Sequence, residues 1–143
     1  MRIRYAGNTH VGMKRDHNED SLCICPEENI YIVADGMGGH ASGEVASQMA
    51  VETLAKFFKE TAEDEDITWP FKMDKDKIYQ ENRLITSIKL SNRRIFESAV
   101  ANQRQKGMGT TIVAVYFTET EVYAAHVGDS RVYRLRGSNL IQI

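Results

Sequence analysis

Apolar residues follow two different periods along the chain. Ile30 to Ala34 is a nearly continuous apolar run, which is typical of a strand buried on both faces. Residues 2–6 and 21–25 are also predicted to be short strands. The strand period returns after Thr110, with a hairpin turn at residues 118–120. The strands predicted in this last part of the chain are residues 111–117, 122–127, 131–135 and 140–143.

Two long segments between these strands have helical spacing. The first begins after a glycine-rich stretch, with Ser42 as the predicted N-cap and Glu44 in the first turn, and ends near Glu60. The second is expected over about residues 77–103, and residues 61–77 are predicted to be a surface loop. One apolar stripe on the second helix predicts core packing, and its members are Leu84, Ile85, Ile88, Ile95, Phe96 and Ala99.

This order of strands, two helices and strands fits an α+β fold with helices packed on antiparallel sheet. The length of 143 residues suits a single domain. A net charge of -2 provides no strong field for nucleic acid or an anionic membrane, and no apolar run approaches a membrane span. We therefore expect a cytoplasmic chain, or the cytoplasmic part of a larger protein, that neither binds nucleic acid nor inserts into a membrane.

Cys23 and Cys25 are the two cysteines of the chain. On a strand their side chains point the same way, which is poor geometry for a disulfide. A zinc site would need a second pair of ligands. Half-buried free thiols are expected, and free thiols fit a reducing compartment.

The segment from Val33 to His40 reads Val-Ala-Asp-Gly-Met-Gly-Gly-His. Its glycines let main-chain atoms approach a ligand closely. Asp35, at the end of the apolar strand, and the Gly36 carbonyl are hard oxygen donors that suit Mg²⁺ or Mn²⁺. The same residues would also form a tight turn between a strand and a helix.

Three further motifs favour the metal-binding interpretation. They are Arg15-Asp16-His17-Asn18-Glu19-Asp20, Gly109-Thr110-Thr111 and Val127-Gly128-Asp129-Ser130-Arg131. In this order the four motifs resemble those of the metal-dependent protein serine/threonine phosphatases of type 2C, and the Asp-Gly-Met-Gly-Gly-His wording resembles the bacterial branch. The resemblance runs from about Gly7 to the last residue. It implies a sandwich of two antiparallel sheets flanked by helix pairs, in α-β-β-α layers, of which residues 1–143 form the N-terminal part.

The resemblance implies hydrolysis of phosphoserine and phosphothreonine in proteins by a metal-activated water. The implied cofactors are Mn²⁺ or Mg²⁺, two or three ions in a complete domain. Asp35 is the expected bridging carboxylate and the Gly36 carbonyl a neighbouring ligand. Of Glu19 and Asp20, one would ligate a metal directly or through water and the other would support it; the sequence leaves open which does which. Asp129 would bind the additional metal of bacterial relatives.

Two residues are candidates for direct roles in catalysis. Arg15 occupies the place of an arginine that clamps the substrate phosphate, a task suited to the forked guanidinium. Many relatives have a histidine directly after the Asp-Gly pair, where this chain has Met37. His40 lies three residues later, and two roles stay open for it: an acid or water-orienting group, and a histidine that holds the loop.

The match fails at the end of the chain. The family's metal site also uses two late aspartates, in an Asp-Gly and an Asp-Asn step, but no Asp or Glu follows Asp129. We therefore expect the N-terminal part of a catalytic domain, with an unfinished sheet at its C-terminal end and little or no turnover alone. The alternative is a catalytically incomplete, phosphatase-like fragment that acts as a binding or regulatory module and dimerises through its unfinished sheet. Expected partners are phosphorylated proteins and a serine/threonine kinase with its targets.

Nucleotide binding by the glycine-rich segment is the other function that we considered. The glycines follow a G-x-G-G spacing, and no Gly-Lys-Ser/Thr step follows them. The phosphate-loop fingerprint is therefore not met.

Overall fold

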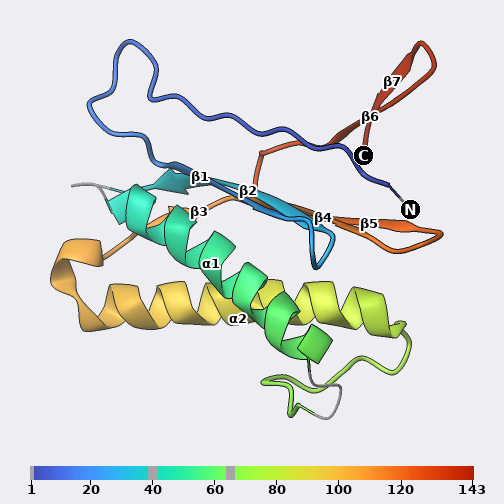
Figure 1. Cartoon of the computed structure of the whole chain (residues 1–143). Helices are drawn as coiled ribbons and strands as arrows, with labels where there is room; N and C mark the ends of the chain where they lie inside the picture. The colour runs from blue at the N-terminus through green and yellow to red at the C-terminus, as the bar shows by residue number, and fades with distance from the viewer. Residues whose placement is uncertain (1, 39–41, 64–66) are drawn as a thin grey trace.

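Two helices cover one face of an antiparallel sheet in the computed structural model, which describes residues 2–38, 42–63 and 67–143 (Figure 1). This arrangement confirms the α+β class. In chain order the elements are β1 (Asp20–Cys25), β2 (Ile30–Met37), α1 (Ser42–Glu63), α2 (Tyr79–Ala101), the 3₁₀ helix η1 (Gln103–Gln105), β3 (Gly109–Thr110), β4 (Ile112–Phe117), β5 (Val122–Val127), β6 (Tyr133–Arg136) and β7 (Asn139–Gln142).

The main sheet has the strand order β1-β2-β4-β5, and the short strand β3 pairs with the end of β2. All of these pairs are antiparallel, and the β4–β5 hairpin has the predicted position. The strands β6 and β7 form a separate two-stranded sheet. β2 lies centrally, between β1 on one side and β3 and β4 on the other, but only alternate residues of it are buried. The predicted burial on both faces is therefore wrong, since Val33 on the face opposite the helices is 51% exposed.

The core lies between this sheet and the two helices. Alternate residues of β2, such as Ile30 and Ile32, are buried on the face that α1 covers. Leu54 and Phe58 of α1 are completely buried there, and Leu84 of α2 is 3% exposed. The Phe58 ring packs edge-on against Tyr116 of β4, with ring centroids 5.0 Å apart. Aliphatic and aromatic packing therefore joins both helices to the middle of the sheet.

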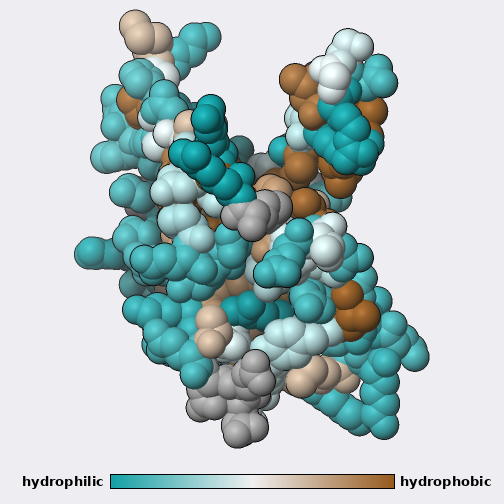
Figure 2. Space-filling model, turned by 45° about the vertical axis from the view of Figure 1, so that its right-hand side comes forward, coloured by the Kyte–Doolittle hydropathy of each residue, from teal (hydrophilic) through white to brown (hydrophobic). Residues whose placement is uncertain are grey.

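The opposite face of the main sheet carries the N-terminal segment and the β6–β7 hairpin (Figure 1). Residues 2–6, predicted to be a strand, have no regular structure, because they pair with no strand in the part of the chain that is described. Instead, Tyr5 packs on Tyr31, with ring centroids 5.8 Å apart. The predicted strand at 131–135 begins later, at Tyr133, and ends at Arg136. Apolar side chains gather on the β6–β7 hairpin (Figure 2), including the exposed Leu135 and Leu140.

Both helices lie close to their predicted bounds, with two differences in detail. Ser42 is the first residue of α1, and its hydroxyl donates to the Arg104 carbonyl at 2.8 Å. This contact joins α1 to the segment after α2 and does not cap the helix. Phe96 was predicted to lie in the core and is 66% exposed. It lines an open groove between α2 and β3, which no element of the described residues fills.

The loop before α2 and the two cysteines follow the sequence predictions. Trp69 anchors the loop by packing edge-on against Phe57 of α1, with ring centroids 5.4 Å apart. Cys23 and Cys25 are free and half-buried. Within the described residues, neither helix combines the length and the apolar character needed to cross a membrane.

Candidate functional site

Asp20 and Asp35 face one another across the β1–β2 pair. Asp20 is the first residue of β1, and its Cα partner on β2 is Asp35. Because side chains of directly paired residues project to the same face of a sheet, both carboxylates lie on the face opposite the helices. The neighbouring Ala34 and Gly36 of β2 are buried on the helix side. The strand register alone therefore brings together two hard oxygen donors that are 15 positions apart.

Four charged side chains from separate segments act on one another at this edge. Burial raises the pKa of Asp35, and the nearby carboxylate of Asp20 raises it further. The charge of Asp129 adds to the effect, while the guanidinium of Arg15 opposes it. The structure thus brings four of the predicted site residues into electrostatic contact, with more negative than positive charge.

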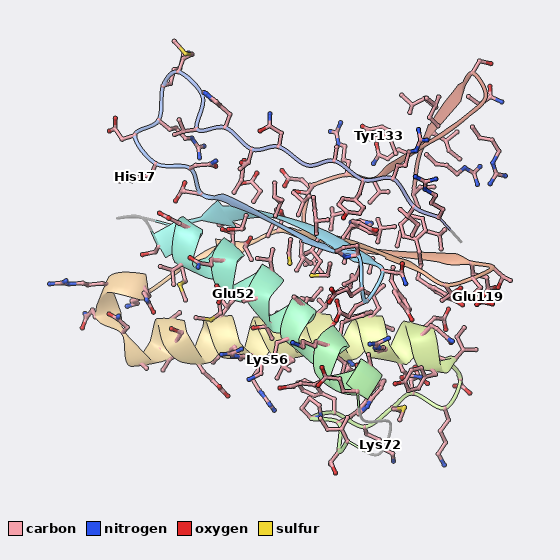
Figure 3. The ribbon with its side chains drawn as sticks, viewed as in Figure 1. His17, Glu52, Lys56, Lys72, Glu119 and Tyr133 are labelled. Atoms are coloured by element: carbon pink, nitrogen blue, oxygen red, sulfur yellow. The ribbon has the colours of Figure 1, made fainter. Side chains whose placement is uncertain are left out.

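Arg15 and Glu19 lie on the loop that precedes β1, the loop that also carries His17 (Figure 3). The Arg15 side chain is 67% exposed, and its Nη1 lies 3.2 Å from Glu19 Oε2. Glu19 is less exposed, because its carboxylate lies over Gly43 in the first turn of α1. The side chain of Asn18 fixes the loop by accepting from the Asp20 amide (3.1 Å) and donating to Thr9 (2.8 Å). The guanidinium is therefore exposed, while the loop that carries it is fixed by the hydrogen bonds of Asn18.

Gly36 lies where three pieces of backbone meet. Its amide donates to the Glu19 carbonyl at 3.0 Å. A Cβ at this position would overlap the Gly43 carbonyl and would lie 2.7 Å from the Glu19 carbonyl oxygen. Only a residue without a side chain permits this approach of β2 to the start of α1. The predicted role of the Gly36 carbonyl as a metal ligand stays a prediction.

The backbone of Asp35 is held on both sides by two threonines of the Gly109-Thr110-Thr111 motif. Thr111 accepts from the Asp35 amide through Oγ1 (3.0 Å), and its own amide donates to the Asp35 carbonyl (2.9 Å). Thr110 donates through Oγ1 to the same carbonyl at 3.0 Å. Thr111 Oγ1 also shares a hydrogen bond of 2.6 Å with Ser130 Oγ, in the turn that carries Asp129. Hydrogen bonds thus link the backbone of Asp35, through Thr111 and Ser130, to the turn that carries Asp129.

Sequence reasoning identified the threonine motif but gave these residues no role. The roles of Thr111, Ser130 and Gly43 depend on contacts between distant segments, 76 positions apart for Asp35 and Thr111, and no local pattern encodes such contacts. Gly128, with φ of 93°, allows Ser130 to reach Thr111, because a Cβ at 128 would lie 2.8 Å from Thr111 Cγ2.

The remaining predicted site residues are His40 and Asp129. His40 lies outside the described residues. Asp129 is exposed in the turn after β5, and Arg131 donates to the Tyr133 hydroxyl at 3.3 Å, a contact within the hairpin region. Among residues 2–38, 42–63 and 67–143, no three His, Cys, Asp or Glu side chains converge as a group able to hold a metal ion. The chain therefore presents a facing carboxylate pair, and not a complete ligand shell.

Replacing Thr111 with valine is expected to lower the free energy of unfolding by about 1–2 kcal/mol, because the Asp35 amide and the Ser130 hydroxyl both lose a partner. Urea denaturation measures this loss, and hydrogen exchange of the Asp35 amide should accelerate. Thr111→Ser, which keeps the hydroxyl, is the control. A valine variant as stable as the serine variant would contradict the role given to this hydroxyl.

Comparison with known proteins places this geometry in a family. A sequence model of the family described as protein phosphatase 2C matches residues 6–143. The serine/threonine phosphatase stp of Listeria welshimeri is 38% identical over 142 residues, which cover 94% of this chain and 51% of that protein. The serine/threonine protein phosphatase PstP of Mycobacterium tuberculosis is 35% identical over 143 residues, covering 99% of this chain and 24% of that protein.

Solved structures agree with this assignment. A crystal structure of the Mycobacterium tuberculosis phosphatase PstP/Ppp superposes with a TM-score of 0.80 at 34% identity, covering 98% of this chain and 53% of that one. The catalytic domain of PstP in complex with two manganese ions gives a TM-score of 0.77. The chain spans about half the length of the Listeria relative and of these crystallised chains. From the four motifs, the fold and the match over residues 6–143, the chain belongs to the protein phosphatase 2C family.

Proposed function

We propose that this chain supplies the N-terminal half of a catalytic domain that hydrolyses phosphoserine and phosphothreonine in proteins with Mn²⁺ or Mg²⁺. The facing pair of Asp20 and Asp35 is the observation that carries the proposal. Thr110 and Thr111 hold the backbone of Asp35, an arrangement called the threonine clamp below, and the Arg15 guanidinium acts on the Asp35 carboxylate. Membership of the phosphatase family and a half-length match support it.

The donor set fits divalent cations. Carboxylate and carbonyl oxygens are the ligands that Mg²⁺ and Mn²⁺ prefer. Asp35 would bridge, Asp20 or Glu19 would ligate directly or through water, and Asp129 would serve an additional ion. Burial raises the pKa of Asp35, and the neighbouring carboxylates of Asp20 and Asp129 raise it further, so a bound cation would stabilise the charged form. When bound, the ions would supply an acidified water as the nucleophile.

The residues of the chain itself would position the substrate and the ligands. Arg15 would place its forked donors on two phosphoryl oxygens and offset their charge. Its side chain is 67% exposed and lies at the surface beside Glu19, where a phosphoryl group could approach it. Thr110 and Thr111 would keep Asp35 in register with Asp20, and Ser130 would couple that position to Asp129. His40 keeps both roles described above.

The partners proposed for the complete protein are phosphoproteins, with a serine/threonine kinase acting on the same targets, in the cytoplasm. Bacterial relatives of this chain carry names that describe serine/threonine phosphatases, which supports the substrate class.

We expect the chain to bind Mn²⁺ and Asp35→Asn to weaken that binding at least about tenfold, because one member of the facing carboxylate pair loses its charge. Electron paramagnetic resonance of free Mn²⁺ during a titration gives both affinities. Glu119→Gln is the matched control, since Glu119 is exposed in the β4–β5 turn (Figure 3). Equal affinity of Asp35→Asn and Glu119→Gln would contradict the metal role.

Hydrolysis of a phosphothreonine peptide with Mn²⁺ tests the activity. The chain alone is expected to show little or no turnover. A fusion of residues 1–143 to the part of the Listeria welshimeri phosphatase that this chain does not match is expected to be active, and Asp35→Asn should abolish that activity. An inactive but folded fusion would favour the alternative, a phosphatase-like binding or regulatory module.

A further inference from the structure

Cys23 and Cys25 form a thiol pair that the phosphatase site does not use. Their Sγ atoms lie 3.0 Å apart, and both side chains are half-buried. Both occupy regular positions of β1, opposite Ile32 and Ile30 of β2. Because Ile30 and Ile32 are buried on the helix side, the thiols lie on that face too, at the strand that ends the sheet order. The pair is therefore built into the edge of the core.

Cys23 of the pair borders an open groove. A groove of about 540 Å³ runs beside Cys23, between β1 and α1, and Val51 and Glu52 of α1 line its other wall. Glu52 lies on α1 in Figure 3. Burial, then the contact with Cys23, and finally the charges of Glu28 and Glu27 raise the pKa of the Cys25 thiol to about 12. The Cys25 thiol is therefore protonated near neutral pH, so an ion that binds here must displace its proton.

The strand geometry disfavours a disulfide between the two cysteines. Residues i and i+2 of a strand lie about 6.4–6.8 Å apart along its axis. A disulfide prefers Cβ atoms about 3.5–4.5 Å apart, so closing one here would bend β1 away from its ladder with β2. A two-coordinate ion would need the Sγ atoms to move apart from their present 3.0 Å, which rotation of the two side chains can provide while the backbone stays in its ladder.

The available ligands restrict the ion. Thiolates select soft metals, chiefly Cu⁺, Zn²⁺ and iron–sulfur clusters. Structural zinc takes four ligands, and iron–sulfur clusters also need four. The chain has only two cysteines, and the described residues bring no third His, Cys, Asp or Glu to the pair as a metal-holding group. An ion that is satisfied by two thiolates remains, and Cu⁺ has that property.

We propose that Cys23 and Cys25 form a two-coordinate site for Cu⁺ between β1 and α1, separate from the phosphatase site. Binding forms two Cu–S bonds and breaks two S–H bonds, and both protons go to solvent. No electron is transferred, so no oxidant or reductant is needed. This site is independent of the proposed phosphatase function, because it uses neither Asp20 nor Asp35.

An anaerobic titration of the whole chain with Cu⁺, in competition with bathocuproine disulfonate, tests the site. One ion per chain is expected, and the number of thiols that react with Ellman's reagent should fall from two to zero. Cys23→Ser and Cys25→Ser should each weaken binding at least about 100-fold, more than the loss that follows changes outside the ligand shell. Circular dichroism checks that both variants are folded.

Two results would overturn the proposal. Equal Cu⁺ uptake by the wild-type chain and either serine variant would place the ion elsewhere. One ion per two chains, with a dimer in sedimentation, would show that the thiols act between chains. Where a serine variant does not fold, the wild-type chain still decides: two thiols that stay reactive with Ellman's reagent after Cu⁺ uptake would place the ion elsewhere, and the stoichiometry shows whether the site lies between chains.

Discussion

Replacing Arg83 with alanine is expected to lower the free energy of unfolding by about 3 kcal/mol or more. Arg83 lies in α2 and is 6% exposed. Its Nε donates to Thr61 Oγ1 (2.8 Å), Nη1 donates to the Tyr116 hydroxyl (3.2 Å) and Nη2 donates to the Phe58 carbonyl. Hydrogen bonds of charged groups contribute about 1.5–3 kcal/mol each, and removing this donor leaves buried acceptors without a partner.

The guanidinium of Arg83 also stacks on aromatic rings. Its central carbon lies 4.3 Å from the centroid of Phe58 and 5.5 Å from that of Tyr116. Such contacts add about 0.5–2 kcal/mol where they are shielded from water. One side chain thus joins α1, α2 and β4, and its loss should also increase the mobility of the end of α1.

Urea denaturation followed by circular dichroism measures the effect. Arg94→Ala is the matched control, because Arg94 lies on the same helix, is exposed, and donates to Thr53 at 2.9 Å. We expect less than about 1 kcal/mol for that control. An Arg83→Ala variant that loses no more than the control would contradict a central role of this arginine in the core.

The second large effect is expected from Gly36→Ala. A methyl group there would overlap the Gly43 carbonyl, and the Glu19 carbonyl oxygen would lie 2.7 Å away. Neither atom can rotate aside, because both belong to the backbone. The end of β2 must therefore separate from α1, at an expected cost of about 3 kcal/mol or more, a magnitude typical of severe overpacking. The same movement would displace Asp35 and weaken Mn²⁺ binding.

Gly109→Ala is the control for this substitution. Gly109 lies on β3 beside Gly36's partner Thr110, but a Cβ there would meet only the flexible Met37 side chain, at 3.6 Å. We expect thermal denaturation to show a much smaller loss than for Gly36→Ala. Similar melting temperatures for the two variants would show that α1 can move away from β2 without loss of packing.

Local patterns were enough to predict most elements of this fold. The apolar run Ile30–Ala34 specified β2, and helical spacing specified α1 and α2 within a few residues. The failures concern long-range partners. Residues 2–6 have strand-like composition but pair with no strand in the described part of the chain. Phe96 has helical core spacing but lines an open groove. Composition and period say which face is apolar, and not what covers it.

The candidate site shows the same division. Motifs identified Asp35, Asp20, Arg15 and Asp129 one at a time. The sheet register pairs Asp20 with Asp35, and Arg15 and Asp129 act on Asp35 from a loop and a turn. The burial of Arg83 was not predicted from the sequence, because an arginine on a helix usually lies at the surface. Its role depends on Thr61 and Tyr116, which are 22 and 33 positions away. No local pattern contains that information.

The clamp on Asp35 has a consequence for the order in which the chain folds. The hydrogen bond from Asp35 to Thr111 spans 76 positions, and Ser130 lies 19 positions beyond Thr111. Closing contacts of such sequence separation is slow compared with forming helices. During synthesis, α1 and α2 can form before this bond, since their residues leave the ribosome first. The aspartate is therefore expected to reach its final position late, after the helical layer is in place and the β4–β5 hairpin has docked beside β2.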